Sequence, residues 1–433
     1  MATIKDRLAT FADQGFQGLG NILAASLFAH ALSRDDFAAM GVAIGIYYFV
    51  AGLLRAGLTL QFIVITARPG GYETQDRQAW FWLNALVVAG ITVLLAAIAA
   101  VMMALRGGAS PTFQLIAVAM ALTAAITPLM LLAEFARRLL YQSRLTVAAA
   151  LASAAQCVGM VGLALVAWRL GGGLGHVVAG WAIGGLAATL IAVLAQPPGR
   201  PGGLRRGLDQ WFENPSLVFW QTLNHVPYSI ASSSLIVLVG AIGGAGAAAV
   251  FNVARTLANP AVAVVSAIDA LDKPRAARAL AHEGLGAVVH SIHRTRRLLV
   301  VLTGGYLLAV SLLASWIIPF AFGPQYAGAE TTVRILAVAF FIICLNQPSE
   351  SLLIVLGESR LMFTMRCVAA VVTLAGLVVA APHGTVGFGI SVAAAQAINL
   401  MLLVFAERLA RRRYAIRNGG DGGRDPRTLL AMN

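Results

Sequence analysis

Residues 79–105 read AWFWLNALVVAGITVLLAAIAAVMMAL, and residues 298–322 read LLVVLTGGYLLAVSLLASWIIPFAF. Neither stretch contains a charged side chain. A helix rises about 1.5 Å per residue, so roughly 20 apolar residues are enough to cross the ~30 Å hydrocarbon core of a bilayer. Both stretches are therefore predicted to be membrane-spanning helices.

The composition of the whole chain agrees with this prediction. Of its 433 residues, 59% are hydrophobic and 11% are charged, and the mean hydropathy is +0.80. Soluble domains carry roughly 25% charged residues, so a soluble fold could not bury this much apolar surface. The net charge of +13 does not indicate a nucleic-acid partner, because the basic residues lie in short segments between apolar runs and not on one face of a soluble module.

Hydropathy predicts an all-α polytopic membrane protein with about twelve transmembrane helices. The first predicted helix carries four polar side chains between residues 13 and 21, and without it the number of spans would be odd. The predicted spans cover residues 11–32, 37–66, 78–105, 113–135, 145–168, 177–195, 217–241, 246–270, 298–322, 331–355, 363–381 and 387–408.

The distribution of Lys and Arg predicts the orientation, since short loops rich in these residues stay in the cytoplasm. With both termini inside, the inner segments hold 25 of the 31 Lys and Arg residues. The outer loops hold only Arg34, Arg106 and Arg169. We therefore expect a multi-pass protein of a bacterial inner membrane with both termini cytoplasmic.

Two longer inner segments divide the chain. Residues 197–215 are rich in Pro, Gly and Arg and are predicted to be a cytoplasmic linker between six-helix bundles at 1–196 and 216–410. Residues 271–297 alternate apolar and basic side chains at helical spacing, which predicts an amphipathic segment along the inner membrane surface. The tail at 411–433 has few apolar residues to pack and is predicted to be disordered.

Two arginines lie inside predicted spans at comparable depth, Arg55 and Arg255. An arginine in hydrocarbon costs at least about 2.5 kcal/mol on insertion scales, so a retained one normally faces a cavity or a partner. Asn252 and Asn259 flank Arg255, and Pro260 follows and disturbs its helix. We expect both arginines to line a water-filled cavity; the alternative is that each pairs with a carboxylate such as Asp13 or Asp269.

Guanidinium suits phosphate, because its planar fork donates two parallel hydrogen bonds and keeps its charge. A pair of arginines therefore predicts an anionic substrate, with pyrophosphate as one candidate. The first helix adds Gln14, Gln17 and Asn21, which recur at three to four residues and share one face. This polar face must point inward, where it contacts substrate or bonds neighbouring helices.

Two later helices carry polar groups beside a proline, where transporters often place gating elements. The first group contains His225 and Pro227, and the second contains Pro348 and Glu350. We consider these residues and Asp13 as candidates for gating or coupling. Glu350 could carry a coupling proton, or form an ion pair with Arg360 or Arg366, and His225 could titrate or serve only in packing.

Catalytic and metal-binding motifs are missing from the sequence. There is no Gly-rich phosphate loop with Lys-Ser/Thr, no HExxH helix, no GxSxG turn and no His/Cys cluster with metal spacing. The three cysteines, Cys157, Cys344 and Cys367, all fall inside apolar runs. We therefore expect no enzymatic activity, no metal and no cofactor.

Several stretches together resemble one transporter family: FADQGFQGLGNILAASLFAHALSRDDFAAMGVA at 11–43, LLRAGLTLQF at 53–62, RRLLYQSRLTVAAALASAAQ at 137–156 and FGPQYAGA at 322–329. They are similar to the polysaccharide-exporter branch of the multidrug/oligosaccharidyl-lipid/polysaccharide (MOP) exporter superfamily, which includes O-antigen and exopolysaccharide flippases. The resemblance covers about residues 11–408. It implies two six-helix bundles in a V shape.

The resemblance also implies a function, in which alternating access flips an undecaprenyl-pyrophosphate-linked saccharide to the outer leaflet. In this family, arginines in the central cavity bind the pyrophosphate, and the matching positions are Arg55 and Arg255. The implied partners are a polyprenyl-pyrophosphate-linked saccharide, the phospholipid bilayer and a glycan polymerase or glycosyltransferase complex.

Two other functions stay open. A cation-coupled multidrug antiporter of the same fold would place carboxylates and aromatics in its cavity instead of arginines. A membrane scaffold for a glycan synthesis complex, which transports nothing, would have a tightly packed interior.

Overall fold

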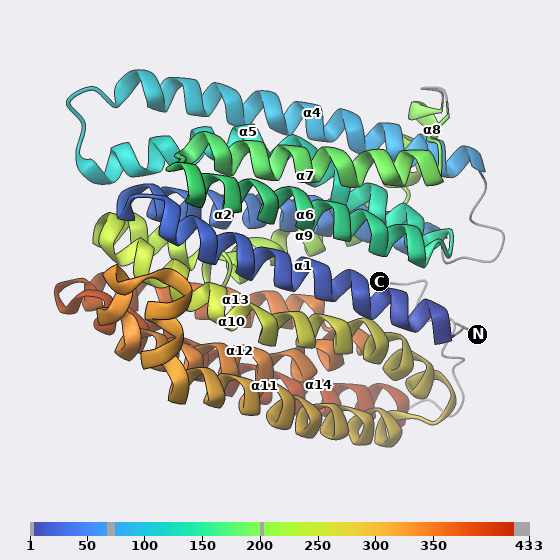
Figure 1. Ribbon diagram of the computed structural model, residues 1–433. Helices are drawn as coiled ribbons and strands as arrows, with labels where there is room; N and C mark the ends of the chain where they lie inside the picture. The colour runs from blue at the N-terminus through green and yellow to red at the C-terminus, as the bar shows by residue number, and fades with distance from the viewer. Residues whose placement is uncertain (1–3, 67–73, 200–202, 420–433) are drawn as a thin grey trace. The chain divides into compact units, whose positions relative to one another are not determined.

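The computed structural model describes residues 4–66, 74–199 and 203–419, which contain fourteen α-helices, short π and 3-10 segments and no strand (Figure 1). The first part holds these elements in order: α1 (Ile4–Ala31), α2 (Arg34–Leu54), a π-helix (Arg55–Thr59), α3 (Leu60–Thr66), α4 (Thr74–Leu105), α5 (Pro111–Gln142), α6 (Thr146–Leu170), α7 (Leu174–Ala195) and α8 (Leu204–Trp211). The second part holds α9 (Pro215–Ile230), α10 (Leu235–His282), α11 (Leu285–Phe322), a 3-10 helix (Pro324–Ala329), α12 (Glu330–Val355), α13 (Ser359–Ala380), a 3-10 turn (Ala381–His383) and α14 (Gly384–Gly419).

Nine helical stretches in the described residues are long and apolar enough to cross a membrane. Two of them, Val218–Val265 and Ser359–Ile416, each hold two predicted spans. The helix α1 is too polar to count among the nine, yet it is helical where a span is predicted. The all-α, multi-pass membrane fold is therefore confirmed, and about twelve spans are consistent with it.

The chain forms two compact units that do not follow a single cut in the sequence. Unit 1 comprises residues 1–218, 233–256 and 318–327, and unit 2 comprises 219–232, 257–317 and 328–433. The boundary at 232/233 falls between α9, which ends at Ile230, and α10, which begins at Leu235. The predicted division at 197–215 stays a prediction, but segments from the later half pack within unit 1.

The predicted linker contains a docked helix. On α8, Trp211 donates from its indole nitrogen to the carbonyl of Gly57 at 2.7 Å. Gln210 accepts from Trp80 on α4 at 2.8 Å, and Arg206 pairs with the buried Asp76 at 2.7 Å. These bonds fix part of 197–215 against unit 1, since they satisfy two indole donors and one buried carboxylate.

Two inner segments differ from their predictions. Residues 271–297 are the ends of α10 and α11, which meet at Gly284 with a φ of 83°. Their apolar side chains Val288 and Ile292 are buried against Leu352 and Leu403 of unit 2, so they pack on protein and not on a lipid surface. At the other segment, α14 continues to Gly419, because Tyr414 joins the same core; residues 420–433 lie outside the described residues.

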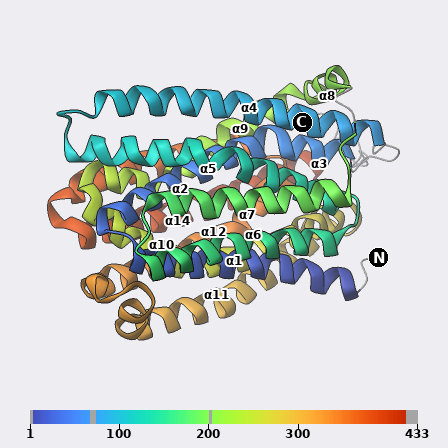
Figure 2. The same ribbon diagram turned by 45° about the horizontal axis from the view of Figure 1, so that its top comes forward.

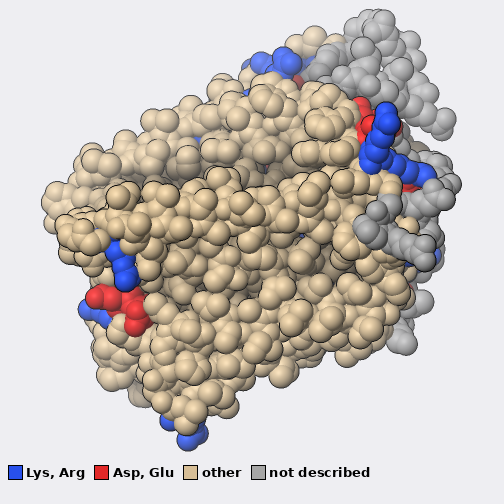
Figure 3. Space-filling view, turned by 90° about the horizontal axis from the view of Figure 1, so that it is seen from above, with Lys and Arg blue, Asp and Glu red and all other residues tan. Residues whose placement is uncertain are grey.

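The helices of unit 1 present an uncharged face to the surroundings. Figures 1 and 2 both show α4, α5 and α7 lying side by side, and α4 packs on α5 and α5 on α7. Exposed side chains on α4 are apolar, among them Val93, Leu94 and Val101. Figure 3 shows a broad face without charge, with charged side chains gathered toward its margins, which is the surface a bilayer requires.

Inside unit 1, α6 and α7 approach so closely that glycine is required at the contact. A Cβ on Gly159 would lie 2.7 Å from the Cα of Gly184, whereas a Cβ on Gly162 of the same helix would have nothing within 4 Å. Small residues of this kind let membrane helices pack backbone to backbone.

This contact predicts that Gly159→Ala destabilises the protein while Gly162→Ala does not. Overpacking at Gly159 should cost about 1–3 kcal/mol and lower the Tm in detergent by about 3–8 °C. Ala at 162 should leave the Tm unchanged or raise it, because Ala favours helix by roughly 1 kcal/mol over Gly. Equal melting temperatures for the two variants would contradict the close contact.

Candidate functional site

The predicted site residue Arg55 lies at an irregular point of a spanning helix. At this residue α2 passes into a five-residue π-helix, in which the N–H of Leu60 bonds to the carbonyl of Arg55. The carbonyl of Gly57 in this turn is taken by Trp211 of α8. Single π turns are rare and frequently occur at functional sites, because the extra residue shifts the direction of the side chains.

The guanidinium of Arg55 is bound to a carboxylate that the sequence analysis did not single out. Its Nε and Nη2 donate to Oε1 of Glu134 on α5, at 2.9 and 2.6 Å. The side chain of Arg55 remains 52% exposed, and that of Glu134 is 17% exposed. The arginine is thus paired with an acid but half-exposed.

The second predicted arginine, Arg255 on α10, contacts an aromatic ring instead of an acid. Its guanidinium carbon lies 4.9 Å from the ring centroid of Tyr48. Its Nη1 atom is buried without a hydrogen-bond partner in the described part of the chain. An unmatched guanidinium donor in a membrane protein is costly and marks a site where an anion or water is expected.

Both arginines belong to unit 1 and meet the same face of α2. Tyr48 and Arg55 are seven residues apart, which corresponds to two turns and about 10 Å along the axis. Arg255 rests on Tyr48, so the structure brings the two predicted arginines to one side of one helix. We call Tyr48, Arg55, Glu134 and Arg255 the arginine site.

The polar face of α1 bonds to its neighbours. Asp13 is fully buried and accepts from Ser153 and Tyr141, and its Oδ1 lies 3.4 Å from Nη1 of Arg137. Gln14 donates to Asp13 at 3.0 Å, and Gln17 donates to Ser153 at 3.4 Å.

Asn21 lies half-buried on the same helix, and in the described part of the chain the hydrogen bonds of Asp13, Gln14 and Gln17 go to neighbouring helices or to each other and not to the arginine site. Of the two roles considered for this face, bonding to neighbouring helices is the one the contacts favour.

The two asparagines predicted beside Arg255 have different surroundings. Asn252 is buried and donates to the carbonyl of Phe37 at 3.3 Å, and its Cγ would lie 2.6 Å from a Cβ on Gly41. It therefore joins α10 to α2. Asn259 is half-buried in unit 2, so it does not share the compact unit of Arg255.

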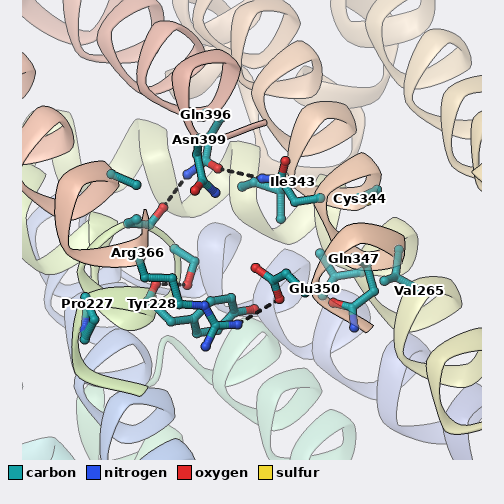
Figure 4. A pocket seen from close by; sticks show the side chains of 15 residues that line it. Pro227, Tyr228, Val265, Ile343, Cys344, Gln347, Glu350, Arg366, Gln396 and Asn399 are labelled. Carbon is teal, nitrogen blue, oxygen red and sulfur yellow. Dashed lines mark hydrogen bonds and ion pairs between the residues drawn. The ribbon is translucent and has the colours of Figure 1, made fainter. Parts of the chain in front are cut away.

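The later candidates gather at a cavity inside unit 2, of about 70 Å³ (Figure 4). Pro227 and Tyr228 of α9 line it together with Glu350 of α12, Arg366 of α13 and Asn399 of α14. This space is enough for several water molecules. His225 lies next to it and shares a hydrogen bond with Ser229 at 2.7 Å, while Pro348 lines a smaller adjoining hollow.

The charges in this cavity are matched. Arg366 donates to Glu350 at 2.8 Å, which is one of the two ion pairs considered for this acid, and its guanidinium lies 4.8 Å from the centroid of Tyr228. Figure 4 shows the pair at one side of the cavity and Gln396 and Asn399 at the other. The Oδ1 atoms of Asn346 and Asn399 are buried without partners in the described residues, which indicates that water fills the space.

Comparison with known proteins identifies the fold. No family model matches the chain, and no curated protein matches its sequence. The fold is similar to an inward-facing multidrug resistance MATE family transporter of the MOP superfamily, with a TM-score of 0.70, 15% identity, and coverage of 94% of this chain and 98% of that one. A lipid II flippase MurJ in an inward closed conformation matches with a TM-score of 0.65 and 11% identity, covering 94% and 88%.

A third structure, of a MOP superfamily transporter from Pyrococcus furiosus, is described as having a binding pocket of reverse polarity. It matches with a TM-score of 0.68 and 15% identity, over 95% of each chain. The chain therefore has the fold of MOP transporters along nearly its whole length. At these identities the likeness does not distinguish the exporter branch named above from the other branches.

Because the charges of the unit 2 cavity are matched, removing one partner of the ion pair should destabilise the protein more than removing both. Arg366→Met leaves Glu350 buried without its partner and should cost about 3–5 kcal/mol of stability. The double variant Glu350→Gln with Arg366→Met should recover most of this loss, since no buried charge remains.

A half-exposed pair, Arg334 with Glu330 at 4.0 Å, serves as the control for thermal melting in detergent. Arg334→Met should cost less than about 1 kcal/mol. A double variant that melts below Arg366→Met would contradict the assignment of Glu350 as a buried, paired charge.

Proposed function

We propose that this protein is a transporter that flips a polyprenyl-pyrophosphate-linked saccharide from the inner to the outer leaflet of a bacterial inner membrane. The single observation that carries the proposal is the arginine site, where Arg55 is half-exposed and Arg255 has no acidic partner among the described residues. Two cations on one face of a spanning helix favour an anionic head group, while the lipid tail stays in the bilayer.

The fold supports transport over catalysis. Structures that match nearly the whole chain are named as transporters, and one of them is named as a lipid II flippase. A lipid is therefore the cargo class named for one protein of this fold. The sequence also lacks the motifs of nucleotide hydrolysis, so we infer that the protein is not an enzyme.

Alternating access needs contacts that can open, and unit 1 contains a set suited to this. Phe37 of α2 packs on Phe322 and Tyr326, with ring centroids 6.5 and 5.5 Å apart. Gln325 donates to the carbonyl of Ala29 at 3.0 Å. These contacts join the first two helices to the end of α11, near the predicted outer loops, and we infer that they close the outer side and separate when cargo leaves.

The unit 2 cavity is the proposed place of coupling. Glu350 lies inside a late span and lines a cavity with room for several water molecules. Pro227 lies inside α9, and Pro348 lies inside α12, the helix of Glu350 itself. Asp13 is the matching buried acid in unit 1. Each acid is bonded to an arginine, and we infer that opening of these two ion pairs accompanies the change of conformation.

The second candidate function is a cation-coupled drug antiporter, which the MATE likeness favours. A site for cationic drugs would be disfavoured by two arginines with only one acid between them, because like charges repel. The composition of the arginine site favours the flippase. A glycan polymerase or glycosyltransferase complex is the partner we expect on the flippase proposal.

The test uses the full chain in vesicles with a fluorescent short-chain polyprenyl-pyrophosphate saccharide, whose outer-leaflet fraction is read by dithionite quenching. Arg55→Ala and Arg255→Ala should each slow flipping by about tenfold or more, since a charged hydrogen bond contributes roughly 1.5–3 kcal/mol. Arg334→Ala, which changes a half-exposed arginine of unit 2, is the matched control and should flip at the wild-type rate.

Ethidium efflux from the same vesicles separates the two candidate functions. Efflux by wild-type protein, with no flipping of the saccharide, would replace the flippase by the antiporter. Normal flipping by both arginine variants would remove the arginine site from the proposal.

A further inference from the structure

The inference concerns Glu134 and rests on the function proposed above. Arg55 donates both its Nε and its Nη2 to one oxygen of this carboxylate, Oε1. A full bidentate pair would use both carboxylate oxygens. The pair is thus one-sided, and the exposed Arg55 keeps a free edge that a second anion could approach.

Glu134 has another cation within reach. Glu134 and Arg138 are four residues apart on α5, so they share a helix face, and they interact electrostatically. The Nε of Arg138 is buried without a hydrogen-bond partner in the described part of the chain. The neighbouring Arg137 is already committed to Asp13. Arg138 is therefore the one of these two arginines that can donate a hydrogen bond to Glu134.

A head group with two phosphates can compete for Arg55 in a way that a single charge cannot. The Glu134 carboxylate carries one negative charge and is held in place by the protein, so it has no entropy cost of association. A monoanion offers no more charge than Glu134 and must pay for its own immobilisation. A pyrophosphate brings more charge, and a second arginine, Arg255, lies on Tyr48 two turns from Arg55 on the same helix.

We propose that Glu134 is a built-in competitor that occupies Arg55 until a diphosphate displaces it, whereupon Glu134 turns to Arg138. The acid thereby sets the affinity of the arginine site, because an anion must displace it from Arg55 before it can bind there. It also returns to Arg55 when the cargo leaves and so favours release.

The test measures binding of geranyl pyrophosphate and geranyl phosphate to the full chain in detergent, by calorimetry at constant salt. Glu134→Gln should bind geranyl pyrophosphate about fivefold or more tightly than wild type. Its affinity for geranyl phosphate should rise by a similar factor, since both anions must displace the same acid from Arg55. Glu134→Gln should also flip cargo more slowly although it binds more tightly. A variant that had only lost structure would show weaker binding and slower flipping together.

Arg138→Met provides a second, independent measurement if Glu134→Gln fails to fold. Without Arg138, Glu134 has no alternative partner, so geranyl pyrophosphate should bind about fivefold more weakly. The double variant Glu134→Gln with Arg138→Met should bind as tightly as Glu134→Gln alone, since Arg138 matters only while the acid is charged.

The results separate this proposal from the function on which it rests. If Arg55→Ala abolishes binding, but Glu134→Gln binds no more tightly than wild type and Arg138→Met binds normally, Glu134 is only structural and the flippase proposal stands. If neither wild type nor Glu134→Gln binds geranyl pyrophosphate, or Arg55→Ala and Arg255→Ala bind it as wild type does, both proposals are overturned.

Discussion

The bond between Arg55 and Glu134 reflects the constraint that governs the whole protein, which is that a charge inside a bilayer must be matched or hydrated. Placing an arginine at the centre of a helix costs at least about 2.5 kcal/mol, and the chain meets this cost in three ways. Arg55 is paired with Glu134 and is half-exposed, Arg255 lies on a tyrosine ring, and Arg137 is bonded to the buried Asp13. Only the first two leave donors for another molecule.

The two units repeat one arrangement without sharing a sequence motif. In unit 1, Asp13 is bonded to an arginine and a tyrosine, Arg137 and Tyr141. In unit 2, Glu350 pairs with Arg366, which stacks on Tyr228. Both acids are buried, and both are neutralised by side chains of the protein itself. The arginine site differs from these pairs because its charges do not balance, and this imbalance is what makes it suitable for an anionic cargo.

Much of the fold follows from the sequence, because the cost of burying charge in lipid is large and additive along a helix. The uncharged runs at 79–105 and 298–322 each form a helix. Helix lengths beyond the membrane could not be read in this way, since hydropathy measures the cost of insertion and not helical continuity. The chain therefore runs on in α10 to His282 and in α14 to Gly419, where apolar contacts within unit 2 extend the helices.

The site was predicted in part. Arg55 and Arg255 stand out as charges in apolar runs, but Glu134 was missed because it lies at the end of a predicted span, where an acid could be read as facing water. The available signal was its depth: Glu134 lies eight residues before the end of α5, and Arg55 lies eleven before the end of α3. The polar α1 residues were placed at the site because a polar face must point inward, yet that rule does not say which neighbour it meets.

The most direct measurement of the central claim is solid-state NMR dipolar dephasing between ³¹P of bound geranyl pyrophosphate and ¹⁵N in the arginine side chains of the bilayer-embedded protein. We predict dephasing that corresponds to nitrogen–phosphorus distances of about 4 Å, as hydrogen-bonded guanidinium and phosphate require, and its loss when Arg55 and Arg255 are both replaced by lysine. Undiminished dephasing in that double variant would show that other arginines hold the phosphates, and it would contradict the account.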